Sequence, residues 1–367
     1  MANSGSNGGA ATPFGGKLRV EGIQTVVPTK PTDPRQSSRI IVSQNLSSTA
    51  VLQRRFHVLL CYNKASDDDS GWLVAGRIKD SLGRALQEQP LLAGRLRRRE
   101  ESGDDLEIVS NDSGIRLVEA KAEMGLGGFV EMKEKRKAEA ELLFWEDVLD
   151  LSPQFSPLFY VTNFKCGGYS IGISCSLLLV DPFLLTTFVK KWANAHNNII
   201  SRNESPKIPT FFLPNHGKPT SSPSLLMGSN TTKDVAESVI FNIPTKILDL
   251  DKIHKNLAAL CVDEAERDAG WKLASNFSLF LKVPFEDDRV EVCTRQGLLD
   301  VPKSCLGMNG MSCARTWDEL ELDEICFSEG NKPIYASCWI NSVVDEGSVM
   351  IVPSTNDLGV KIVVTFT

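Results

Sequence analysis

Residues 158–181 read LFYVTNFKCGGYSIGISCSLLLVD, two long apolar runs joined by a short glycine-containing connection. The runs 158–164 and 169–179 have the length and composition of buried β-strands, and the four residues KCGG between them suit a hairpin. Pro182 follows, and proline is favoured in the first turn of a helix because the N–H that it lacks would have no helical partner there. The stretch therefore predicts a β-hairpin that leads into a helix over 182–192.

The rest of the chain alternates strand-like and helical segments without internal repeats. Apolar runs and alternation predict strands, whereas apolar spacings of three and four residues predict helices. The expected strands cover 17–27, 56–61, 105–109, 115–119, 237–243, 279–283, 348–353 and 360–366. The expected helices cover 73–87 and 132–143, begin near 247, and include one around Trp271. This order of elements is typical of an α/β (α+β) protein.

Shifts in composition divide the chain into four regions. Residues 1–16 are rich in Gly, Ser and Ala, and we expect a disordered tail there. Residues 201–234 are rich in Pro, Ser, Asn and Thr, which favours a crossover or linker. We therefore expect an N-terminal lobe over 17–200 and a C-terminal lobe over 235–367.

The composition also excludes several classes of function. A net charge of −6 without a sustained basic face argues against nucleic-acid binding. The nine cysteines include no C-x-x-C pair and the four histidines lie far apart, so we expect no metal site. No apolar run reaches the length of a membrane span. Because the cysteine count is odd and no signal peptide is recognisable, we expect a reducing, cytoplasmic compartment. We also expect a monomer.

Several segments, in order along the chain, are similar to a single family. They are VVPTKPTDPRQ (26–36), IKDSLGRALQEQPLLAGRLR (78–97), the hairpin itself, FVKKWA (188–193) and the stretch from Trp317 to Lys332-Pro333. These segments resemble the plant BAHD acyl-CoA-dependent acyltransferases. The resemblance implies two similar lobes, each a mixed β-sheet with helices as in chloramphenicol acetyltransferase. It also implies an active-site channel between the lobes.

In that family the histidine of an HxxxDG motif is the general base that takes a proton from the acceptor alcohol or amine. When the hairpin and Asp181 are aligned with the motif, the histidine position falls on Leu177 and the glycine position on Pro182. Leucine cannot accept a proton, so the ordinary base is missing. The resemblance gives Asp181 a structural role, with Arg295 in the other lobe as its candidate partner. Asp181 equally suits the N-cap of the helix that follows.

Polar residues near Leu177 offer no clear replacement for the base. Alternation along a strand that continues to 179 puts Cys175 on the same face as Leu177 and Ser176 on the opposite face. Cys175 has no neighbouring base in the sequence, so we interpret it as a packed core thiol. Ser174 is not distinctively placed, and we interpret His196 as a helix C-cap or a surface residue. We therefore assign no catalytic residue.

A second family motif, DFGWG, aligns with Phe327-Ser328-Glu329-Gly330-Asn331, where its acid and its tryptophan are both replaced. Just before it, the six residues MSCART (311–316) stand where the family has a longer helical segment. The C-terminal lobe is therefore expected to be shortened, and the case for a family-type CoA site is weaker.

These departures are similar to those of the eceriferum/Glossy clade of wax proteins within the family. The resemblance implies an accessory factor in very-long-chain fatty acid elongation for cuticular wax synthesis. Such a factor acts with a 3-ketoacyl-CoA synthase, a condensing enzyme, at the cytosolic face of the endoplasmic reticulum, and acyl-CoA is a candidate ligand. Two alternatives stay open. One is an acyl-CoA-dependent O- or N-acyltransferase, or a repurposed lyase, that uses the same channel. The other is a truncated inactive copy.

Overall fold

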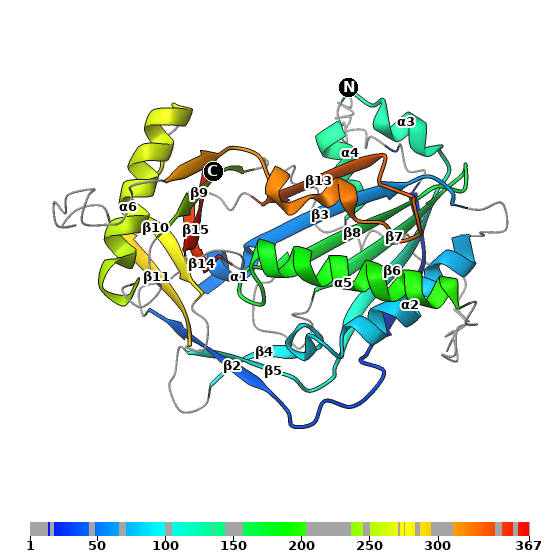
Figure 1. Ribbon diagram of the computed structural model, residues 1–367, viewed down its shortest axis with the longest axis horizontal. Coiled ribbons are helices and arrows are strands. Elements are labelled where there is room, and N and C mark those ends of the chain that lie inside the picture. The colour runs from blue at the N-terminus through cyan, green and yellow to red at the C-terminus, as the bar shows by residue number, and fades with distance from the viewer. Residues whose placement is uncertain are drawn as a thin grey trace, which may run out of the picture.

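Two β-sheets with helices packed on them make up the computed structural model of this chain (Figure 1). The α/β fold with two lobes that the sequence predicts is confirmed. The structure describes residues 14, 18–43, 48–65, 71–99, 105–133, 135–143, 157–202, 236–244, 250–270, 272–274, 276–282, 287–294, 311–341, 347–354 and 359–366.

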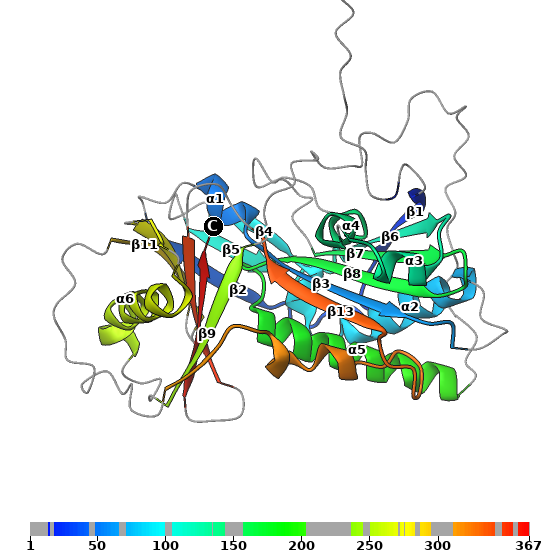
Figure 2. The ribbon, with the colours of Figure 1, turned by 90° about the horizontal axis from the view of Figure 1, so that it is seen from above.

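The first sheet has six strands. They are β1 (Leu18–Val26), β3 (Arg55–Tyr62), β6 (Ile115–Ala122), β7 (Leu158–Phe164), β8 (Tyr169–Ser176) and β13 (Tyr335–Ile340), in the spatial order β1-β6-β7-β8-β3-β13. Helices α2 (Gly71–Ala85) and α5 (Pro182–Ser201) cover one face, and α3 (Leu126–Val130) and α4 (Lys135–Glu141) cover the other (Figure 2). Because both faces of β3, β7 and β8 are buried, these strands are predominantly apolar.

The second sheet has nine strands. They are β2 (Ser37–Val42), β4 (Arg95–Arg98), β5 (Leu106–Val109), β9 (Glu237–Ile243), β10 (Asn276–Leu281), β11 (Asp288–Thr294), β12 (Ser312–Ala314), β14 (Gly347–Pro353) and β15 (Val360–Phe366). Their order is β12-β9-β15-β14-β10-β11-β2-β5-β4. Helix α6 (Leu250–Ala269) packs its apolar stripe, which includes Leu257 and Cys261, on one face of this sheet. Short helices α1 (Ser48–Gln53), η1 (Pro90–Ala93), η4 (Asp318–Leu320) and η5 (Leu322–Glu324) lie in the connections.

Strands cross between the two halves of the chain. β2, β4 and β5 come from the N-terminal half but extend the sheet of C-terminal strands, in which β2 runs parallel to β11. In return, β13 pairs antiparallel with β3 at the edge of the six-stranded sheet. Each half of the chain therefore contributes strands to both sheets.

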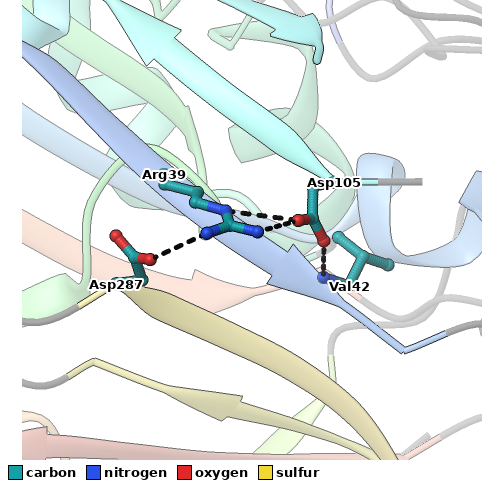
Figure 3. Close-up of polar contacts among 4 residues, drawn as sticks. All are labelled: Arg39, Val42, Asp105 and Asp287. Carbon is teal, nitrogen blue, oxygen red and sulfur yellow. Dashed lines mark hydrogen bonds and ion pairs between the residues drawn. The ribbon is translucent and has the colours of Figure 1, made fainter. Parts of the chain in front are cut away.

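An ion cluster joins β2 to its neighbours in the nine-stranded sheet (Figure 3). The Arg39 guanidinium contacts the Asp105 carboxylate at 2.5 Å, before β5, and Asp287 at 3.6 Å, before β11. Asp105 also accepts a hydrogen bond from the N–H of Val42 at 3.3 Å. The hydrogen bond with Asp105 raises the pKa of Arg39, so the pair stays charged. Because Arg39 is partly exposed, the cluster orients β2 more than it stabilises the fold.

The hairpin and its helix are confirmed, with altered ends: β8 stops at Ser176 rather than 179, and α5 continues to Ser201 rather than 192. The helix expected over 132–143 is present but shorter, as α4 over 135–141, and a separate short helix that was not predicted, α3, precedes it. Strands β2, β4, β11, β12 and β13 were not predicted. The helix expected around Trp271 is wrong for the described residues, because α6 ends at Ala269 and residues 272–274 are not helical. Trp271 itself lies outside the described ranges, as do nearly all of the expected tail and linker.

Among the described residues, no helix is both long enough and apolar enough to cross a membrane. The same residues contain no group of three or more His, Cys, Asp or Glu side chains placed to hold a metal ion.

Candidate functional site

The turn that follows β8 carries the position aligned with the motif histidine. Ser176 ends the strand by offering two acceptors to this turn. Its carbonyl oxygen accepts from the N–H groups of Leu179 at 3.0 Å and Val180 at 3.3 Å, and its hydroxyl accepts from the N–H of Leu178 at 3.2 Å. The strand alternation expected to link Cys175 with Leu177 therefore stops at Ser176.

Leu177 is part of the main apolar core, and only 1% of it is exposed. Its N–H donates to the carbonyl oxygen of Arg54 at 3.1 Å, which extends the pairing of β3 and β8 beyond the end of β8. The same core holds Phe183, and the Trp317 ring packs against Phe183 with the ring centroids 6.3 Å apart. The position aligned with the motif histidine is thus a densely packed apolar site.

Asp181 is the N-cap residue of α5. Its carboxylate accepts hydrogen bonds from the N–H groups of Phe183 and Leu184, both at 2.9 Å. Burial raises the pKa of Asp181, whereas the two cap bonds and the nearby Lys282 ammonium oppose that rise. Arg295 lies outside the described residues, so its pairing with Asp181 stays a prediction.

Lys282, directly after β10, connects the two sheets at this turn. Its ammonium donates to the carbonyl oxygen of Leu178 at 2.9 Å and contacts the Asp288 carboxylate at 2.6 Å. The sequence reasoning missed this residue. The available signal was its position directly after the apolar strand FSLFL. A lysine beside a buried strand is itself partly buried, and a buried cation needs a nearby acceptor.

Cys175 does not supply a nucleophile. The thiol is fully buried on the face of β8 that packs under α2 and α5, and burial raises its pKa to about 12. A thiol with that pKa is almost entirely protonated near neutral pH, and only the thiolate attacks carbonyl carbon well. Ser174 points to the opposite face of the sheet, beside His57 in the strand register.

His196 is not a cap or a surface residue, which corrects the sequence interpretation. It lies inside α5, 3% exposed, and its Nδ1 is 2.9 Å from the hydroxyl oxygen of Ser81. The Trp192 indole N–H donates to the same hydroxyl at 2.9 Å. Burial lowers the pKa of His196 to about 4. The imidazole is therefore a neutral, hydrogen-bonded core group, and its burial separates it from any substrate in solvent.

The stretch aligned with the second motif packs against α5 and bonds to the end of β3 in the six-stranded sheet. Phe327 is fully buried, and its ring lies edge-on to the Trp192 ring at 4.6 Å. Just before it, the carbonyl oxygen of Ile325 accepts a hydrogen bond from the Tyr62 hydroxyl at 2.8 Å. At its other end, the Asn331 side chain donates to the carbonyl oxygen of Asn63 at 2.9 Å. This stretch keeps a packing role although two residues of the family motif are replaced.

A pocket of about 990 Å³ opens beside β13, and Leu177 does not line it. Trp317 belongs to the pocket wall and also packs against the main apolar core, since its ring lies 5.2 Å from that of Phe56. The remaining lining residues come from β13, from the start of β9, from residues 132–136 and from residues 315–324.

Comparison with known proteins gives the family. A family model described as the Transferase family matches residues 17–236. The chain belongs to the Transferase family. The resemblance to BAHD acyltransferases is thereby confirmed, and curated relatives of the chain include two ECERIFERUM proteins of Arabidopsis thaliana.

Protein ECERIFERUM 26-like of Arabidopsis thaliana is 33% identical over 121 residues, which cover 32% of this chain and 28% of that protein. Protein ECERIFERUM 2 of the same plant is 36% identical over 113 residues, or 29% of this chain and 27% of that protein. The matches therefore span less than a third of either relative. The crystal structure of vinorine synthase aligns over 95% of this chain and 94% of its own, with 16% identity and a TM-score of 0.46.

Proposed function

We propose that this chain is an accessory protein of very-long-chain fatty acid elongation in cuticular wax synthesis, and that it lacks ordinary acyl transfer. The observation that carries the proposal is Leu177. At the position aligned with the motif histidine the chain has a buried leucine in an apolar cluster, and a leucine side chain cannot take a proton from an acceptor. Removal of a general base typically lowers a rate by about 10²–10⁴-fold.

The buried titratable groups of the neighbouring elements β3, β8 and α5 do not restore the base. Burial lowers the pKa of His57 to about 3 and that of His196 to about 4, so both imidazoles are neutral and enclosed. Burial acts in the opposite direction on the Cys175 thiol and raises its pKa to about 12. Each of these groups is at most 3% exposed, so none can reach a substrate that enters from solvent.

The kinship with ECERIFERUM proteins supports a role in wax synthesis rather than in acyl transfer. In this proposal the partner is a 3-ketoacyl-CoA synthase, which would place the chain at the cytosolic face of the endoplasmic reticulum. Acyl-CoA is then a ligand held or presented for the partner, and this chain does not cleave its thioester.

The test is co-expression with a plant 3-ketoacyl-CoA synthase in yeast, followed by analysis of acyl chain lengths. The synthase alone is the baseline. We expect the pair to shift the products to longer chains and the Leu177→Met variant to shift them equally, because that change keeps an apolar side chain of similar volume. A product profile that the chain leaves unchanged would overturn the proposal.

The pocket beside β13 favours a second candidate, an acyltransferase or lyase that binds its substrate there. Trp317 and Trp339 offer aromatic surface in this hollow, as ligand sites often do. Release of CoA from a panel of acyl-CoA donors and acceptors by the purified chain would support this candidate. The remaining alternative is an inactive copy. It would be favoured if the purified chain showed no cooperative unfolding transition.

A further inference from the structure

β13 is the edge strand of the six-stranded sheet in the described part of the chain, and it pairs with β3 on one side only. Its residues 335–339 all line the pocket beside it. An open strand edge presents N–H and C=O groups that can pair with another strand. The pocket is therefore bounded by backbone that is ready to bind a strand, as well as by side chains.

The register identifies which residues point their backbone groups into the pocket. The N–H of Asn341 donates to the carbonyl oxygen of Arg55 at 3.1 Å, one residue beyond β13. Antiparallel pairing alternates along a strand, so Tyr335, Ser337 and Trp339 bond to β3. Ala336 and Cys338, in between, direct their N–H and C=O groups away from β3. In the described residues neither has a further backbone partner.

The pocket walls on the two faces of β13 differ in charge. On the α4 face the wall carries Lys133, Lys135 and Arg136, and the Lys135 ammonium lies 4.8 Å from the centre of the Tyr335 ring. On the other face it carries the acidic side chains of Asp318, Glu321, Asp323 and Glu324. Glu321 pairs with Lys190 at 2.8 Å and Glu324 with Lys332 at 2.6 Å, so Asp318 and Asp323 supply most of the negative charge, and the cation Arg315 also lines the pocket. Figure 2 shows α4 and the orange turns of η4 and η5 on opposite sides of β13.

We propose that the open edge of β13 binds an extended segment of the condensing-enzyme partner as an added β-strand. Successive side chains of a strand point to opposite faces. The bound segment would therefore place acidic side chains toward Lys133, Lys135 and Arg136, and basic side chains toward residues 318–324. This inference rests on the proposed function, because it takes its partner from there.

An extended peptide fits these features better than a small acyl thioester does. Five strand residues span about 17 Å, and main-chain pairing along such an edge supplies affinity while alternate side chains supply specificity. A thioester offers a single carbonyl and would leave most of the outward-facing groups of Ala336 and Cys338 unpaired. It would also present no basic group to the acidic wall at residues 318–324.

The test uses proline, which removes one backbone N–H. Ala336→Pro and Cys338→Pro delete outward-facing donors, and proline is tolerated on an edge strand when its N–H position faces away from the sheet. Ala336→Val and Cys338→Ser are matched controls that keep both donors. The readouts are co-purification with the co-expressed 3-ketoacyl-CoA synthase and the acyl chain-length profile. We expect the double proline variant to bind about tenfold more weakly, and the controls to bind like the wild type.

The outcomes separate this inference from the proposed function. If the wild-type chain neither binds the synthase nor shifts the products, both fail. If proline variants that unfold cooperatively shift the products as the wild type does, the edge-binding inference is overturned while the proposed function stands. If the proline variants do not fold, the test uses Lys133→Glu and Asp323→Lys instead, since both residues are exposed and line opposite walls of the pocket. Binding unaffected by both charge reversals would overturn the inference.

A photo-crosslinking amino acid at position 336 identifies the occupant directly. A crosslink to a peptide of the synthase supports the inference. A crosslink to another segment of this chain, or to a second copy of it, overturns the inference, because the edge is then already occupied.

Discussion

The ammonium of Lys282, on the nine-stranded sheet, donates a hydrogen bond to the carbonyl oxygen of Leu178, 2.9 Å away in the turn after β8. This contact joins the two sheets at the turn that begins with Leu177. Lys282 also pairs with Asp288 at 2.6 Å, and both side chains are less than a fifth exposed. One lysine therefore links the turn to the neighbouring lobe.

Replacement of Lys282 by methionine should destabilise the protein by about 2–3 kcal/mol. The change leaves the Asp288 carboxylate largely buried without its cation, and it removes the donor to Leu178. Urea unfolding measures the loss. The double variant Lys282→Met/Asp288→Asn should lose less than the two single losses combined, because each single variant already breaks the same pair. Additive losses would contradict an energetic link between the two residues.

Stability should fall in acid partly because of His196. Its pKa is about 4 in the folded protein and 6.5 ordinarily. Between these pH values the imidazole is protonated in the unfolded chain but neutral in the folded chain. The contribution of neutral His196 to the free energy of unfolding is therefore complete above pH 6.5 and is lost as the pH falls toward 4. In this window the slope of the unfolding free energy should include about 1.4 kcal/mol per pH unit from His196.

The variant His196→Gln tests this assignment, since glutamine can still bond to Ser81 but does not titrate. We expect its free energy of unfolding, measured by urea titration from pH 4 to 7, to depend less on pH than that of the wild type. His57→Gln is the comparison, because the pKa of His57 is about 3 and its contribution extends to lower pH. An unchanged slope in His196→Gln would show that another group is responsible.

Leu177→His should not create an active acyltransferase. The imidazole would enter a core site that is 1% exposed, and burial would lower its pKa as it does for His57 and His196. We expect a destabilisation of about 3 kcal/mol and no gain in CoA release from acyl-CoA donors. Leu177→Met is the matched control. A marked gain of acyl transfer in the histidine variant would instead support the enzymatic candidate.

Asp181→Ala should cost about 1 kcal/mol through the loss of the N-cap of α5. Asp181→Asn should cost less, because asparagine also caps helices. Burial raises the pKa of Asp181 above its ordinary value of 3.8, so the ionised carboxylate is favoured less in the folded chain than in the unfolded chain. As pH rises through the folded pKa, the stability of the asparagine variant relative to wild type should therefore improve. If the difference in unfolding free energy between Asp181→Asn and the wild type did not change from pH 3 to 7, the raised pKa would be contradicted.

Local signals in the sequence predicted most of the elements but not all of their ends. The hairpin and α5 follow from apolar runs and from Pro182, which depend on neighbouring residues only. The end of β8 did not follow, because Ser176 ends the strand through hydrogen bonds that strand periodicity does not encode. Strands β2 and β4 also escaped prediction, since each is short and half-exposed, and β2 is completed by partners from distant parts of the chain.

By itself, the sequence determined the family, the two-lobed α/β class and a leucine at the position aligned with the motif histidine. Motif order and residue identity are linear properties, so no coordinates are needed to read them. Only the tertiary structure decided that Leu177 is sealed in a core, that His196 is a buried neutral group and that Lys282 joins the lobes. It also decided that, among the described residues, β13 presents an open edge to a charged pocket. These features depend on which distant segments meet, and burial and pairing are set by that packing.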